Sequence, residues 1–96
     1  MDLDIELKRK VLKYRSVTFR ALQKVGFIAE PGTKEFEIAK DYMEMAQNYY
    51  NDGCYFQEKG DLLTALASFS YAHAWMDAGV RAKILLGTDS DLFTLP

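Results

Sequence analysis

The sequence is poor in the residues that build disulfide-rich, zinc-bound or low-complexity proteins. It has one cysteine, Cys54, and two prolines, one of which is the last residue. A single thiol excludes an internal disulfide framework and a cysteine-based zinc site, because both need several sulfur atoms at set spacings. Two prolines and six glycines in 96 residues exclude collagen-like and proline-rich segments. The chain must therefore fold by burying apolar side chains.

Long apolar runs and a secretion signal are also lacking. No stretch reaches the roughly 20 consecutive apolar residues of a membrane helix. The chain begins Met-Asp-Leu-Asp-Ile-Glu, which is acidic where a secretion signal is basic. Together with the lone cysteine, this favours a cytoplasmic protein that has no membrane contact. Because 49% of the residues are hydrophobic and 27% are charged, we expect one globular domain over residues 1–96.

Charge is distributed unevenly along the chain. Residues 2–24 carry seven basic and three acidic side chains, whereas the remainder carries five basic and eleven acidic ones. The net charge of −2 therefore combines a basic first quarter with an acidic remainder. Such a dipolar chain can neutralise itself on folding or in a head-to-tail contact.

Apolar residues recur at helical spacing in three segments, and no run alternates for long enough to indicate a sheet. The sequence predicts an all-α fold, an antiparallel three-helix bundle with helices at about 3–25, 34–59 and 62–86. Capping residues precede each helix, namely Asp2 or Asp4, then Thr33, then Asp61. Gly26 and Gly87 are the expected stops of the first and third helices.

The pair Gly60-Asp61 predicts a tight hairpin between the second and third helices, with Gly60 in the left-handed conformation. Gly53 lies inside the second helix, where it costs about 0.8–1 kcal/mol relative to alanine. Either the helix bends at Gly53 or another helix comes close there. The tail at 88–96 carries Leu92, Phe93 and Leu95, and is either docked on the bundle or loose.

The first and third helices carry apolar residues on two sides. Ile5, Leu12 and Phe19, seven residues apart, lie nearly opposite the core-facing stripe of the first helix. A three-helix monomer would leave such residues exposed, so the sequence predicts a homodimer.

Residues 49–72 resemble a single tetratricopeptide unit. Gly53, Phe56, Gly60-Asp61, Ala65, Phe69 and Ala72 hold the small, aromatic and turn positions of that helical hairpin. The closing proline of the motif is replaced by Asp77, and no second copy of about 34 residues follows. This resemblance therefore implies one hairpin and excludes a solenoid with a concave peptide groove.

Over its whole length the chain resembles the short archaeal family called domain of unknown function number three hundred and fifty-seven. The residues that carry the resemblance are the basic first helix around Tyr14, Ala39–Tyr42, Tyr55-Phe56, Gly60-Asp61, Ala65-Leu66, Tyr71-Ala72 and Trp75–Gly79. The resemblance implies a helical bundle and an archaeal source, and it implies no activity.

No catalytic, cofactor or metal constellation stands out, so the sequence predicts a protein that is not an enzyme. His73 lies on the apolar stripe of the third helix, which is typical of a hydrogen-bonded histidine of the core or its rim. Cys54 has no histidine or basic residue within three positions to activate it. Glu37, Asp41 and Glu44 share a helical face but lack a histidine, and are expected to form a solvated edge that pairs with Lys34 and Lys40.

Two surfaces are candidates for binding a partner. One is a basic stripe on the first helix, formed by Arg9, Lys13, Arg20 and Lys24, which faces nucleic acid, an acidic protein surface or only solvent. The other is the pair Tyr71 and Trp75 beside small residues of the third helix, which suits close packing of the first helix or of a second subunit. We expect a non-catalytic module that binds an unidentified protein partner. The alternative is a nucleic-acid or nucleotide-associated accessory protein that uses the basic stripe, although the pI of about 5.3 disfavours it.

Overall fold

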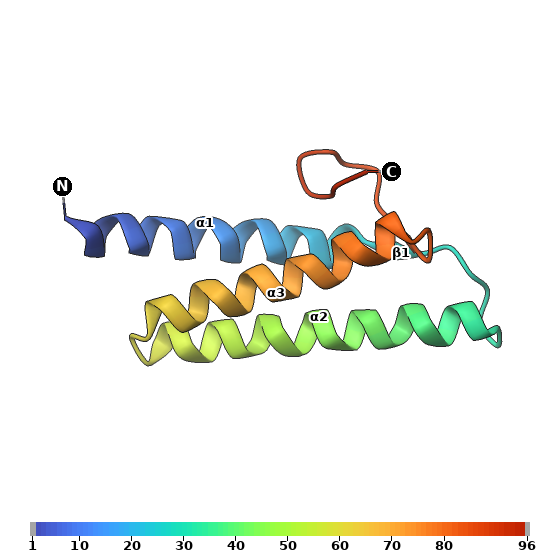
Figure 1. Cartoon of the computed structure of the whole chain (residues 1–96), viewed down its shortest axis with the longest axis horizontal. Coiled ribbons are helices and arrows are strands. Elements are labelled where there is room, and N and C mark those ends of the chain that lie inside the picture. Colours follow the sequence, from blue (N-terminus) through green and yellow to red (C-terminus); the bar gives the residue numbers. More distant parts are fainter. Residues whose placement is uncertain (1, 96) are drawn as a thin grey trace.

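Three long helices make up the computed structural model of the chain, which describes residues 2–95 (Figure 1). Helix α1 spans Leu3–Lys24, α2 spans Lys34–Glu58 and α3 spans Leu62–Arg81. Successive helices run in opposite directions, and α3 lies between α1 and α2 (Figure 1). The predicted all-α, antiparallel three-helix bundle is confirmed.

Each helix begins at a capping side chain in the sequence. Asp2, and not Asp4, caps α1, because its carboxylate accepts a hydrogen bond from the Asp4 N–H at 2.9 Å. Thr33 accepts from the Phe36 N–H at 3.2 Å, and Asp61 accepts from the Thr64 N–H at 3.3 Å. These bonds satisfy amide donors that the first turn of a helix leaves free.

The α2–α3 hairpin turns at Gly60, which has φ 82°. The Asp61 N–H closes the turn on the Phe56 carbonyl at 2.9 Å. Farther along the hairpin, Gly53 is buried, and a Cβ there would lie 2.5 Å from the Phe69 ring. Helix α2 is unbroken through this position. Of the two expectations for Gly53, close approach of another helix is therefore the correct one.

The prediction for the end of the third helix is wrong, because α3 stops at Arg81 and not near residue 86. Lys83 adopts the left-handed conformation at φ 64°, and the Ile84 N–H bonds back to the Gly79 carbonyl at 3.1 Å. The chain reverses before Gly87, so Gly87 is not the stop. Reversal buries Leu85, whose side chain takes the space that a side chain at Gly79 would need.

After this reversal, the chain forms a short strand pair that the sequence did not predict. Strand β1 (Gly26–Phe27) pairs antiparallel with β2 (Leu85–Leu86), with Gly26 opposite Leu86 and Phe27 opposite Leu85. Gly26 therefore lies in a strand, and α1 ends two residues before it at Lys24.

The tail is docked, which decides between the two expectations for it. Leu92 and Phe93 are 2% and 4% exposed and belong to a buried cluster with Leu85, Met76 and Val80. The Thr94 N–H donates to the Asp77 carboxylate at 2.9 Å, and Arg81 donates to the Leu95 carbonyl at 3.0 Å. The tail therefore completes the core at one end of α3.

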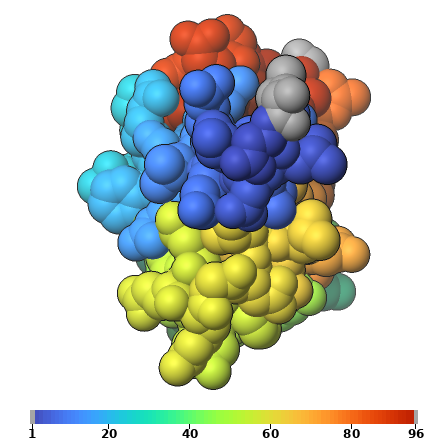
Figure 2. All heavy atoms as spheres, turned by 90° about the vertical axis from the view of Figure 1, so that its left-hand side faces the viewer, coloured from blue at the N-terminus to red at the C-terminus, as the bar shows by residue number. Residues whose placement is uncertain are grey.

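A second buried cluster lies toward the α2–α3 turn and contains Val11, Ala65 and Phe69. Viewed from the end at which α1 begins, the side chains of α1 lie directly against those of this turn (Figure 2). Among residues 2–95, no helix is both long and apolar enough to cross a lipid bilayer.

We expect Gly53→Ala to destabilise the protein although alanine favours helix. The added methyl group must displace the fully buried Phe69 ring, and such overpacking costs about 1–3 kcal/mol, against which the gain in helix propensity is only about 1 kcal/mol. Urea denaturation measures the difference. Asp52→Ala, at the exposed neighbouring position, is the control that should leave stability nearly unchanged. A Gly53→Ala protein more stable than wild type would contradict the close approach.

Candidate functional site

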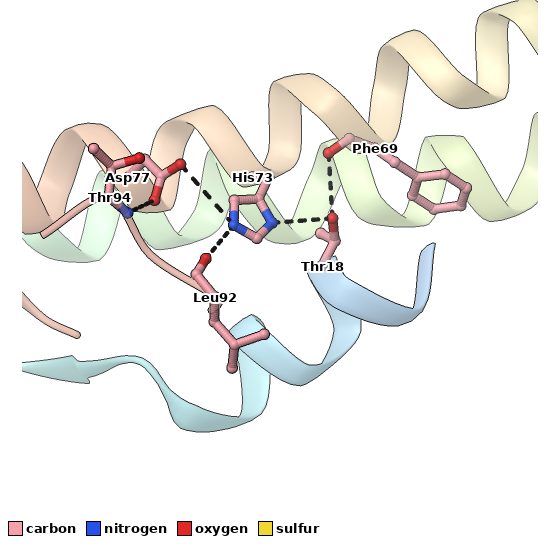
Figure 3. A network of polar contacts seen from close by, with 6 residues as sticks. All are labelled: Thr18, Phe69, His73, Asp77, Leu92 and Thr94. Carbon is pink, nitrogen blue, oxygen red and sulfur yellow. Dashed lines mark hydrogen bonds and ion pairs between the residues drawn. The ribbon is translucent and has the colours of Figure 1, made fainter. Parts of the chain in front are cut away.

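His73 joins α1, α3 and the tail in one polar network (Figure 3). Its Nε2 donates to the Leu92 carbonyl, and its Nδ1 lies 3.3 Å from the hydroxyl of Thr18, which also contacts the Phe69 carbonyl at 3.5 Å. The Asp77 carboxylate lies 4.0 Å from Nε2. Since both ring nitrogens bind structural groups, the interpretation of His73 as a hydrogen-bonded histidine of the core or its rim is confirmed.

The remaining chemistry-bearing residues are dispersed. Cys54 is half-buried beside Tyr50, and the pKa of Tyr50 is raised chiefly by burial and then by the Cys54 neighbour, with Arg15 acting in the opposite direction. Glu37, Asp41 and Glu44 line a shallow hollow on α2 together with Lys40. The predicted pairing with Lys34 and Lys40 is wrong, because none of these carboxylates lies within 4.0 Å of a lysine nitrogen among residues 2–95. In the same part of the chain, no group of three His, Cys, Asp or Glu side chains is arranged to hold a metal.

Three members of the predicted basic stripe form no ion pair, although Arg20 lies close enough to Asp89 to help lower the pKa of that carboxyl. Arg9, Lys13 and Arg20 are exposed on α1, with no ion pair to any carboxylate in the described part of the chain. Lys24 instead binds the Asp89 carboxylate of the tail at 3.4 Å. The pKa of Asp89 lies below its usual value, chiefly because the Asp91 N–H donates to its carboxylate and then because of Lys24. Lys24 thus helps to hold the tail.

The predicted aromatic pair lies on an open face of α3. Tyr71 is 60% exposed and stacks against Tyr49 of α2, with ring centroids 5.4 Å apart. Trp75 is half-buried and meets Tyr42 edge to face at 5.0 Å. Between the aromatic rings and the small residues is a shallow hollow of about 240 Å³, lined by Tyr71, Ala74, Trp75 and Ala78. We call these four residues the α3 face.

Helix α1 does not cover the α3 face. His73 points toward Thr18 of α1, and Tyr71 and Trp75 each lie two residues away, or about 200° around the helix. The α3 face therefore lies on the far side of α3 from α1. Of the two expected neighbours, the first helix is excluded. The basic stripe and the aromatic pair are not brought together into one surface.

The structure adds a groove between α1 and α2 that sequence reasoning missed. Leu12, Arg15, Ser16 and Phe19 of α1 line a hollow of about 420 Å³ with Tyr50 of α2. Part of it was signalled by the seven-residue spacing of Leu12 and Phe19. The contributions of Arg15 and Tyr50 depend on how α1 packs on α2, which no local pattern reveals.

Comparison with known proteins identifies the family. Residues 13–85 match the family model described as Protein of unknown function (DUF357). The chain belongs to the DUF357 family. The DUF357 match includes both residues of the aromatic pair and most of the basic stripe, and leaves Arg9 and the docked tail outside. No curated protein and no solved structure matches the chain.

We expect Lys24→Met to raise the pKa of Asp89 toward its usual value without reaching it, since the Asp91 N–H remains. Because the folded-state pKa is lowered, Asp89 stabilises the docked tail above its unfolded-state pKa, and this contribution is lost as the pH falls through the folded-state pKa. A carboxyl-carbon NMR titration of the wild-type and Lys24→Met proteins measures the Asp89 pKa in each. Lys8→Met, which breaks a pair with Asp4 elsewhere on α1, should leave Asp89 unchanged. An unchanged Asp89 pKa in Lys24→Met would contradict the assignment.

Proposed function

We propose that the chain is a non-catalytic, cytoplasmic protein-protein interaction module that pairs with a second copy through the α3 face. One observation supports this proposal most strongly. The hollow at Tyr71, Ala74, Trp75 and Ala78 stays open after α1, α2 and the tail have all packed against α3. The cytoplasmic assignment rests on the free thiol of Cys54.

The composition of the α3 face suits contact with its own copy. All four of its residues are uncharged, so a two-fold contact that places the face against itself brings no like charges together. Ala74 and Ala78 are small and exposed and let a second helix approach closely, while Tyr71 and Trp75 supply large aromatic area. Interface cores are enriched in such aromatic side chains and depleted in charge.

We expect a solution mass of two chains for the wild-type protein at micromolar concentration, measured by sedimentation equilibrium. Ala74→Glu and Ala78→Glu each place a charge in the middle of the α3 face and should give a single-chain mass with an unchanged helical spectrum. Asn48→Glu adds the same charge to an exposed position of α2 and should remain a dimer. A wild-type protein with the mass of one chain would refute pairing through this face.

Nucleic-acid binding is the second candidate function, favoured by the three free cations of α1. Arg9, Lys13 and Arg20 are exposed and form no ion pair within 4.0 Å among the described residues, so they are available to phosphates.

Retention on a polyanion column at moderate salt tests this second function. If the protein acts through phosphates, retention should fall steeply with salt and disappear in Arg9→Gln/Lys13→Gln/Arg20→Gln, because each phosphate contact releases counterions. Lys34→Gln/Lys40→Gln/Lys59→Gln, which removes three exposed cations from α2 and its C-cap, is the matched control. Equal loss of retention in both variants would mean that only overall charge matters.

A further inference from the structure

Contacts between α1 and α2 hold several of the side chains that form the groove between these helices. The Phe19 and Tyr50 rings lie 6.0 Å apart across it, and Tyr50 in turn packs on the buried Phe69 at 5.6 Å. Arg15 of α1 donates to the Gln57 side chain of α2 at 2.7 Å, which ties the two helices together beneath the opening. Of the five side chains that line the hollow of about 420 Å³, Arg15, Phe19 and Tyr50 are therefore held by contacts between the helices.

Beyond the hollow, an apolar seam follows α1. Ile5, Leu12 and Phe19 are all exposed and are spaced by seven residues, so they lie on one line along the helix. At 1.5 Å per residue, the seam extends about 21 Å, the length of a helix of about four turns. An apolar residue once in every heptad gives a second helix one line of contact at a small crossing angle, whereas the positions between, Lys8, Arg9, Arg15 and Ser16, are polar.

Cations border the apolar seam. Arg9, Lys13 and Arg20 follow one side of it and form no ion pair in the described part of the chain, and Arg15, which donates to Gln57, lies on the other side. At the Ile5 end, Asp2 and Glu6 share a hollow with Ile5 and Arg9. A second copy of α1 on this seam would place cations against cations, which disfavours pairing of α1 with itself. The occupant must instead bring carboxylates beside its own apolar seam, where Arg9, Lys13 and Arg20 face it.

The acidic helix of a second copy does not meet that need. On the exposed face of α2, the positions seven residues apart are Glu37, Glu44, Asn51 and Glu58, all of them polar. Helix α2 therefore has the charge of the occupant without its apolar seam. Phosphates would leave Ile5 and Leu12 uncovered, since neither side chain can stack on a base.

We infer that the α1–α2 groove binds an acidic amphipathic helix of a partner protein, with apolar residues at heptad spacing and glutamate or aspartate beside them. The contact forms a fourth helix on the bundle, next to α1 and α2. The inference goes beyond the proposed function, because it assigns a different partner to a surface distinct from the α3 face. The two surfaces are tested by different variants.

The test uses the full-length protein and two labelled synthetic peptides of about three heptads. Both have leucine at positions seven apart, and they differ only in having glutamate or lysine beside the leucines. By fluorescence anisotropy, we expect the glutamate peptide to bind and the lysine peptide not to bind. Affinity for the glutamate peptide should fall about tenfold or more in Leu12→Ala/Phe19→Ala and in Arg9→Glu/Lys13→Glu/Arg20→Glu. Leu63→Ala, an exposed leucine of α3 outside the groove, should bind as wild type does.

Several outcomes would overturn the inference. Equal binding of both peptides, or equal loss in Leu63→Ala, would mean unspecific adhesion to exposed apolar residues. Labelled single-stranded DNA that binds wild type but not Arg9→Glu/Lys13→Glu/Arg20→Glu, without any binding of the glutamate peptide, would make nucleic acid the occupant. Dissociation of a wild-type dimer by Leu12→Ala/Phe19→Ala would make a second copy the occupant. If the peptide fails while Ala74→Glu still separates a dimer, the groove inference falls and the proposed function stands.

Discussion

The close approach of α2 and α3 at Gly53 is the constraint on which the rest of the bundle depends. The Phe69 ring occupies the space that any side chain at this position would need, and it is fully buried there. With the ring in place, Tyr50 packs on it from α2, and the Phe69 carbonyl faces Thr18 of α1. The absence of a side chain at Gly53 therefore sets the distance between α2 and α3, and the position of Phe69 in turn affects how α1 packs on this hairpin.

Placing α3 in the middle divides the surface into parts with different chemistry. One side of α3 binds α1 through Thr18 and His73, and the opposite side keeps Tyr71 and Trp75 in contact with α2 and solvent. Because α1 packs mainly against α3, a groove remains between α1 and α2. An uncharged aromatic face and a cation-bordered apolar groove favour different partners, and an antiparallel three-helix layout leaves room for both.

Local chemistry was predictable from the sequence, whereas contacts between distant segments were not. The caps at Thr33 and Asp61 and the left-handed Gly60 need only neighbouring residues, and each was found. The end of α3 was missed because Lys83, which has no glycine-like freedom, is held at positive φ by the burial of Leu85 and the strand pair. Likewise, helical spacing was enough to recognise the aromatic pair. The ion pair that takes Lys24 out of the basic stripe was not predictable, because its partner Asp89 lies 65 residues away in the chain.

The most direct test of the central claim, that the α3 face is left open for a protein, is photo-crosslinking inside the native cell. A benzoylphenylalanine introduced in place of Ala74 should give a covalent protein adduct that survives nuclease treatment. The same residue in place of Asn48, exposed on α2, should give none. An adduct at Ala74 alone would support the account. Equal labelling at both positions, or an adduct at Ala74 that nuclease removes, would contradict it.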